Sequence, residues 1–143
     1  MKSNIKDEWF IAEGRHEGQR LLVRLNIGAR PMVGDKQYPF KVGIAIQFKS
    51  PQADGMPNED ELQRFARIED MLFNRFDVEH TGVLCIVITT GGMREFVIYS
   101  KIDNVSDMIE DVSLHFPTYD FQHYVEQDKN WDEFTYWTER LGK

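Results

Sequence analysis

Alternation of hydrophobic and polar positions predicts six β-strands along the chain. They cover residues 9–12, 19–27, 41–49, 82–90, 94–101 and 119–127. The alternation is clearest in the third, where Val42, Ile44 and Ile46 share one face. The opposite face of that strand carries Gly43 and Ala45, which are small enough to lie beneath a bulky side chain. Strand 82–90 is apolar on both faces, so we expect it to be covered on both sides.

Two glycine-containing segments predict turns between neighbouring strands. Residues 13–18 separate the first two strands, and their glycines allow positive φ angles. Gly91 and Gly92 separate strands 82–90 and 94–101. In a hairpin closed there, Arg94 and Glu95 fall on opposite faces of the following strand.

Three segments show the 3.6-residue period of amphipathic helices: about 58–76, 105–116 and 130–141. Asn58 with Glu61, and Asn130 with Glu133, have the spacing of a capping box, with each asparagine as N-cap. The expected apolar stripes are Leu62, Phe65, Ala66, Leu72, Phe73 and Phe76 in the first helix, Val105, Met108, Ile109, Val112 and Phe116 in the second, and Trp131, Phe134, Trp137 and Leu141 in the third. Pro117 ends the second helix.

The order of these elements predicts a single α+β domain over residues 1–143. Its core, about 41–127, reads β-α-β-β-α-β, which is the ferredoxin-like order with two helices on one sheet face. An N-terminal hairpin at about 8–30 and a C-terminal helix at about 130–141 flank this core. In that topology strand 82–90 would lie at an edge. We therefore expect the hairpin to pair beside it and the last helix to cover the open face.

Charge is unevenly distributed, and this bears on the choice of partner. Residues 1–102 carry 14 Lys and Arg against 14 Asp and Glu, whereas residues 103–143 carry 3 against 10. The acidic C-terminal part disfavours nucleic-acid binding, which needs cations for the phosphates. No apolar run approaches the length that spans a bilayer, and no secretory signal is visible, so we expect a cytoplasmic protein and no membrane partner.

Catalytic and cofactor motifs find little support in the sequence. The "TTGGMREF" segment lacks the lysine of a phosphate-binding loop and leads into a strand rather than a helix, so it predicts a hairpin turn. The four histidines show no metal-ligand spacing. Cys85 lies in the most apolar strand, where we expect a buried, inert thiol. The sequence therefore predicts no catalytic residue, no metal and no cofactor.

Glu69 stands in the middle of the apolar stripe expected for helix 58–76. A carboxylate there must find a partner or change its pKa. We expect a structural ion pair with an arginine from the sheet, Arg94 or Arg24. The alternative is a general acid or base with a raised pKa, at a small-molecule or catalytic site formed by the same three residues.

Several segments in a shared order resemble an uncharacterised bacterial family, domain of unknown function 695. They are "YPFKVGIAIQF", the "GMP" loop before a helix containing "IED", the "TTGGMREFVIY" hairpin, and "DKNW" followed by an aromatic helix. The resemblance runs from Trp9 to Leu141 and implies an α+β domain without an established activity. Where the family has Asp-Pro-x-Trp, this chain has Asp-Lys-Asn-Trp at 128–131. The layout and acidity also resemble, more loosely, the regulator B type of ribonuclease E inhibitor.

These observations predict a non-enzymatic binding or regulatory domain that engages the basic surface of a protein partner. The expected docking residues are Asp107, Glu110, Asp111, Asp132 and Glu133 in the acidic C-terminal part. A sheet edge that accepts a partner's strand is the alternative docking mode. The alternative function is a small-molecule or catalytic domain at Glu69, Arg94 and Arg24.

Overall fold

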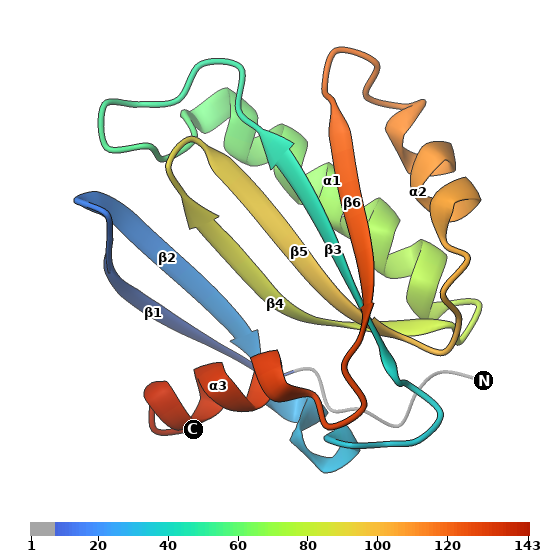
Figure 1. The fold of residues 1–143 in the computed structure, drawn as a ribbon. Helices are drawn as coiled ribbons and strands as arrows, with labels where there is room; N and C mark the ends of the chain where they lie inside the picture. Colours follow the sequence, from blue (N-terminus) through green and yellow to red (C-terminus); the bar gives the residue numbers. More distant parts are fainter. Residues whose placement is uncertain (1–7) are drawn as a thin grey trace.

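A computed structural model describes residues 8–143 as one antiparallel sheet with helices on both faces (Figure 1). The strands are β1 (Trp9–His16), β2 (Gln19–Asn26), β3 (Phe40–Gln47), β4 (Gly82–Thr90), β5 (Met93–Ser100) and β6 (Phe121–Gln127). Their order across the sheet is β1-β2-β4-β5-β3-β6. The helices are the 3-10 helix η1 (Ile27–Met32) and the α-helices α1 (Glu59–Asp77), α2 (Ser106–Ser113) and α3 (Asp132–Arg140). The predicted α+β class is confirmed.

The two faces of the sheet carry separate apolar cores. Helices α1 and α2 pack on one face, as expected, against residues such as Ile44, Phe96 and Ile98. Helix α3 and η1 pack on the other face, where Trp131 and Phe134 contact the second core. The sheet is thus a central layer that both cores share, and the faces can be treated as two distinct surfaces.

Strand β4 is buried because neighbours and helices surround it. Strand β2 of the N-terminal hairpin pairs with it on one side and β5 on the other, so the expected pairing of the hairpin is confirmed. A bulge between Leu84 and Ile86 interrupts the alternation, and both Cys85 and Ile86 belong to the core beneath α3. Cys85 is fully buried, and burial raises the pKa of its thiol, as expected for an inert cysteine.

The turn of the N-terminal hairpin is shorter than the six residues expected from the sequence. Strand β1 continues to His16, and only Glu17 and Gly18 connect it to β2. Both residues have positive φ, 52° and 79°, which suits the right-handed twist of a two-residue hairpin. The longer turn was inferred from Gly14, which instead lies within β1 opposite Leu21.

The apolar stripe predicted for α1 differs from the observed one by a rotation about the helix axis. The buried positions are Glu61, Phe65, Ile68, Leu72 and Phe76. Leu62 and Phe73, expected in the core, are 47% and 41% exposed, and Ala66 is exposed as well. The helix has more apolar residues than its contact with the sheet can cover, so packing selects one of two overlapping stripes.

Both predicted capping boxes need correction. The Asn58 side chain accepts the Glu61 N–H as expected, but the Glu61 carboxylate binds the N–H groups of Lys49 and Ser50 instead of closing the box. At α3 the cap is not Asn130. The Asp128 side chain accepts the N–H of Asp132 at 2.7 Å, and Trp131 precedes the helix in a left-handed conformation.

Candidate functional site

A hydrogen-bonded carboxylate lies on the part of the sheet that α3 leaves uncovered. Tyr124 on β6, Gly43 on β3 and Val97 on β5 are register neighbours, so their side-chain directions lie on one face. The Tyr124 ring extends across Gly43, where even a Cβ atom would fall 2.2 Å from it. Its hydroxyl donates a 2.6 Å hydrogen bond to the Glu95 carboxylate on β5. Only glycine at position 43 allows this crossing.

Lys41 occupies the next position of β3 on the same face and binds two carboxylates. Its ammonium lies 2.9 Å from Glu133 on α3 and 3.3 Å from Glu126 on β6. The lysine also lies 5.8 Å from the centre of the Tyr124 ring. Four elements thus meet in one cluster, the acidic sheet face, which we define as Lys41, Glu95, Tyr124, Glu126 and Glu133.

The acidic sheet face carries three carboxylates and one ammonium. Burial raises the pKa of Glu95; the Tyr124 hydroxyl opposes this change, and the charge of Glu133 adds to it. Burial also raises the pKa of Tyr124, and its bond to Glu95 raises it further. Lys41 loses hydration, but its bonds to Glu133 and Glu126 outweigh that loss and leave its pKa raised. Glu133 and Glu126 thus share one ion-pair partner, whereas Glu95 has only a neutral hydroxyl.

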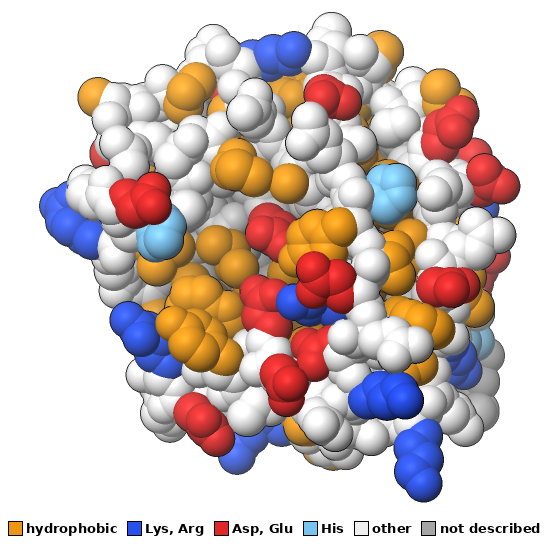
Figure 2. Space-filling view, viewed as in Figure 1, with side chains coloured by type: hydrophobic (Ala, Val, Ile, Leu, Met, Phe, Trp, Pro, Cys, Tyr) orange, Lys and Arg blue, Asp and Glu red, His pale blue; other side chains and the backbone are white. Residues whose placement is uncertain are grey.

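Helix α3 fixes the border of this face. The Trp131 ring stacks on Tyr99 at 4.1 Å, and its indole N–H donates to the Tyr38 carbonyl at 2.9 Å. The Tyr99 hydroxyl in turn donates to Asp128 at 2.7 Å. These contacts hold Glu133 above Lys41. Figure 2 shows the result as acidic side chains gathered around a basic one in the middle of the molecule.

Glu69 makes the ion pair that the sequence predicted, and the partner is Arg24. Both carboxylate oxygens accept from the guanidinium at 2.8 Å, in a bidentate pair that joins α1 to β2. The side chains of Arg24 and Glu69 are 25% and 19% exposed. Arg24 also lies over the Trp9 ring, 4.9 Å from its centre. The predicted ion pair between Glu69 and an arginine of the sheet is present, and Arg94, the other arginine considered, lies nearby without joining it.

The five acidic residues predicted to form one docking face are not brought together. Asp107, Glu110 and Asp111 lie on α2, and Asp132 and Glu133 lie on α3, which packs on the opposite face of the sheet. Asp111 is paired with Arg75 at 2.8 Å. Of the five, only Glu133 belongs to the acidic sheet face. A single acidic docking surface built from all five is therefore incorrect.

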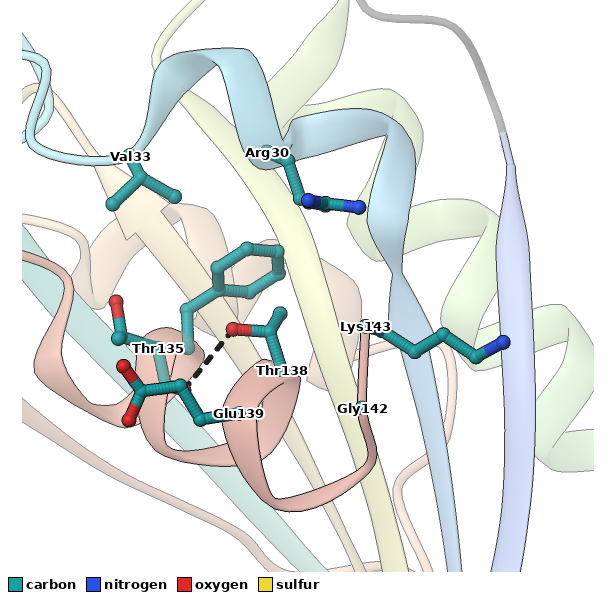
Figure 3. A pocket seen from close by; sticks show the side chains of 8 residues that line it. Arg30, Val33, Thr135, Thr138, Glu139, Gly142 and Lys143 are labelled. Atoms are coloured by element: carbon teal, nitrogen blue, oxygen red, sulfur yellow. Dashed lines mark hydrogen bonds between the residues drawn. The ribbon is translucent and has the colours of Figure 1, made fainter.

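A shallow pocket of about 370 Å³ lies between η1 and α3 (Figure 3). Arg30, Lys143 and Glu139 line its open side, and Thr138 donates a hydrogen bond to the Thr135 carbonyl. Phe134 is its buried lining residue, and the charged side chains around it are exposed. The pocket thus offers no buried polar group that would fix a ligand.

Within residues 8–143, no group of three or more His, Cys, Asp or Glu side chains is arranged to hold a metal ion. This includes the carboxylates of the acidic sheet face. Among the helices of the same residues, none has both the length and the apolar character needed to cross a bilayer.

Sequence reasoning missed Lys41, Glu95, Tyr124 and Glu126 because the cluster depends on the strand order. One signal did point to it. The small residues Gly43 and Ala45 on one face of β3 indicated a bulky neighbour, and Tyr124 is that neighbour. Its identity could not be read from the sequence, since it depends on the register between β3 and β6, which places Tyr124 opposite Gly43.

Fold and site together define a small α+β domain with a six-stranded antiparallel sheet, one face of which carries a carboxylate cluster. The chain belongs to the family of unknown function DUF695, which matches residues 7–137. The resemblance noted in the sequence is thereby confirmed. Comparison with curated proteins found no match, and comparison with solved structures found none either.

Proposed function

We propose that this protein is a cytoplasmic, non-enzymatic binding or regulatory domain that engages a basic segment of a partner protein. The docking surface is the acidic sheet face rather than the five acidic residues expected from the sequence. One observation carries the proposal: Glu95 is a half-buried carboxylate that has a hydroxyl partner and no ion pair among the described residues.

The chemistry of the face suits an arginine or lysine side chain of a partner. A cation placed beside Glu95 would supply the missing positive charge and offset the repulsion from Glu133. The Tyr124 ring offers an aromatic surface of the kind that attracts cations, as its contact with Lys41 illustrates. On α3, the helix that borders the face, Tyr136 is a further aromatic side chain and is 52% exposed.

The fold assignment forms part of this proposal. We infer that residues 40–127 are a ferredoxin-like unit to which the hairpin β1–β2 adds two strands. The partial order β4-β5-β3-β6 and the shared face of α1 and α2 support the assignment. The strands added beside β4 depart from it. The looser likeness to the ribonuclease E regulator stays a prediction.

The test is a titration of the protein with a synthetic Arg/Lys-rich peptide and with its charge-reversed Asp/Glu counterpart. We expect the basic peptide to bind, to shift the NMR signals of Glu95 and Tyr124, and to dissociate as salt rises. Binding should also strengthen as pH rises through the pKa of Glu95. The acidic peptide should do none of this.

A pair of variants matched in charge separates this face from the other acidic residues. The double variant Glu95→Gln/Glu126→Gln removes two charges from the acidic sheet face, and Asp107→Asn/Glu110→Gln removes two from α2 on the other side. We expect the first to weaken basic-peptide binding at least about tenfold, as for lost charge-assisted hydrogen bonds, and the second to change it little. Equal effects of the two variants would refute the assignment. Binding insensitive to both variants and to salt would indicate strand addition at β1 or β6 instead.

A further inference from the structure

Arg94 is a buried cation on the α1 side of the sheet, opposite the acidic sheet face. It is 5% exposed, and its Nε donates a 2.8 Å hydrogen bond to the Thr89 hydroxyl on β4. Its guanidinium lies 5.8 Å from the centre of the Phe65 ring on α1. The head group is therefore fixed between β4 and α1, and its two terminal nitrogens remain as donors.

The charge of Arg94 has no carboxylate in direct contact among the residues that the structure describes. Glu69 is the nearby carboxylate, and both of its oxygens are engaged by Arg24. Among residues 8–143, Arg94 makes no ion pair. Burial, and after it the charge of Arg24, lower the pKa of Arg94 to about 10, and Glu69 only partly opposes them.

Helix α1 does not fully cover the row of side chains beside this guanidinium. Glu13, Leu22, Thr89 and Arg94 are register neighbours in one row of the face that α1 covers. Leu22 is only half-buried, which shows that α1 does not seal the row beyond β4. On the helix, Leu62 and Ala66 flank Phe65 and are exposed. Glu13, at the far end of the row, is paired with Arg20 at 2.6 Å.

We propose that Arg94, with Arg24 beside it, forms a binding site for an oxyanion, namely the carboxylate or phosphate group of a small ligand that enters between α1 and β2. The terminal nitrogens of Arg94 form a planar fork that matches two oxygens of such a group. Thr89 and Phe65 hold the fork in place before the ligand arrives. Arg24 adds positive potential while it keeps its pair with Glu69.

This site is independent of the proposed docking of a basic partner, because the two lie on opposite faces of the sheet and bind opposite charges. Loss of one activity leaves the other intact. The Glu95→Gln/Glu126→Gln variant serves as a check, since it should bind oxyanions as the wild type does.

The experiment titrates inorganic phosphate and, separately, acetate into the full chain, with ionic strength held constant by sodium chloride. Two signals are followed: the melting temperature and the NMR resonance of the Arg94 Nε–H group. We expect a saturable rise in melting temperature and a saturable shift of that resonance with at least one anion. The anion that binds more tightly identifies the ligand group.

Two variants complete the test. Arg94→Lys keeps the charge but loses the fork, and should weaken anion binding on the order of tenfold. Arg75→Lys, changed on the exposed part of α1 where Arg75 pairs with Glu79 and Asp111, should leave binding unchanged. If neither anion moves the Arg94 resonance in the wild type, or if Arg94→Lys binds as the wild type does, the proposal is wrong. The Arg94 resonance of the wild type tests anion binding even if the Arg94→Lys variant fails to fold.

Discussion

The Tyr124 hydroxyl reaches across β3 to the carboxylate of Glu95, 2.6 Å away, and joins the outermost strand to the third strand from that edge. The crossing depends on Gly43 between them. This relationship gives the acidic sheet face its shape, because the aromatic ring lies flat along the sheet rather than standing away from it.

Gly43→Ala should displace the Tyr124 ring, since the new Cβ would lie 2.2 Å from it. The ring is the far end of a side chain at the sheet edge and can swing outward, so the loss is chiefly its bond to Glu95. We expect a decrease of about 1 kcal/mol in the free energy of unfolding, measured in urea. Gly14→Ala on β1, where no atom lies within 4 Å of the new Cβ, is the matched control. Equal effects would mean that the ring does not lie over position 43.

Glu95 should make stability fall as pH rises. Its pKa in the folded protein is raised above 4.5, so the folded state holds the proton longer than the unfolded state does. The contribution is fully present below 4.5 and is lost as pH rises through the folded pKa. Glu95→Gln removes this dependence. The free energy of unfolding of the wild type minus that of the variant should therefore decline as pH rises from 4.5 through the raised pKa of Glu95. A difference in unfolding free energy that does not change with pH would mean that the pKa of Glu95 is not raised in the folded protein.

Glu61 should be among the most costly carboxylates to remove. It is 1% exposed and accepts hydrogen bonds from the N–H groups of Lys49 and Ser50 and from the Tyr119 hydroxyl. These bonds connect the loop before α1 to the segment that follows α2. Glu61→Ala leaves these donors unmatched and should cost about 3 kcal/mol in urea unfolding.

Exposed Glu59, in the same helical turn, is the control for Glu61, and Glu59→Ala should cost less than about 1 kcal/mol.

The contribution of Glu61 to stability depends on pH with the opposite sign to that of Glu95. Burial acts to raise the pKa of Glu61, but its hydrogen bonds outweigh burial and hold it below 4.5. Its contribution is present above 4.5 and is lost as pH falls through the lowered value. A loss for Glu61→Ala no larger than the control's would place this side chain in solvent.

Glu69→Ala should lower stability by about 2 kcal/mol, between the values for exposed and fully buried ion pairs, because the pair with Arg24 is bidentate but partly exposed. Asp70→Ala, one position along the helix and exposed, is the control. A double-mutant cycle with Arg24→Ala measures the pair itself. Additive effects of the two changes would mean that the residues do not interact in solution.

Local patterns were enough to predict most elements and the Glu69 pair, because a carboxylate beside apolar helix positions must find a cation nearby. The buried stripe of α1 was harder. Phe65, Ile68, Leu72 and Phe76 follow the helical period, but so do Leu62 and Phe73, and only the position of the sheet decides between them. Sequence cannot supply that position.

The role of Glu61 could not be predicted either. The capping spacing with Asn58 explained it fully at the level of sequence, whereas its actual donors come from a loop 11 and 12 residues away and from Tyr119, 58 residues away. The acidic sheet face could not be predicted for the same reason. Its residues come from β3, β5, β6 and α3, and their meeting depends on the strand order. Long-range contacts of this kind appear only once the fold is known.

The place of the N-terminal hairpin in the sheet has a consequence during protein synthesis. Strand β2 is made early, but its neighbour β4 begins at Gly82 and its cover α3 at Asp132. At ribosomal speeds, the interval between β2 and α3 is on the order of 5–20 s. Until then Val23 and Leu25 lack the cover of α3, and until β4 is made the edge of β2 also lacks its partner, which is the condition under which nascent strands aggregate. The segment 19–26 is therefore where a ribosome-associated chaperone would be needed most.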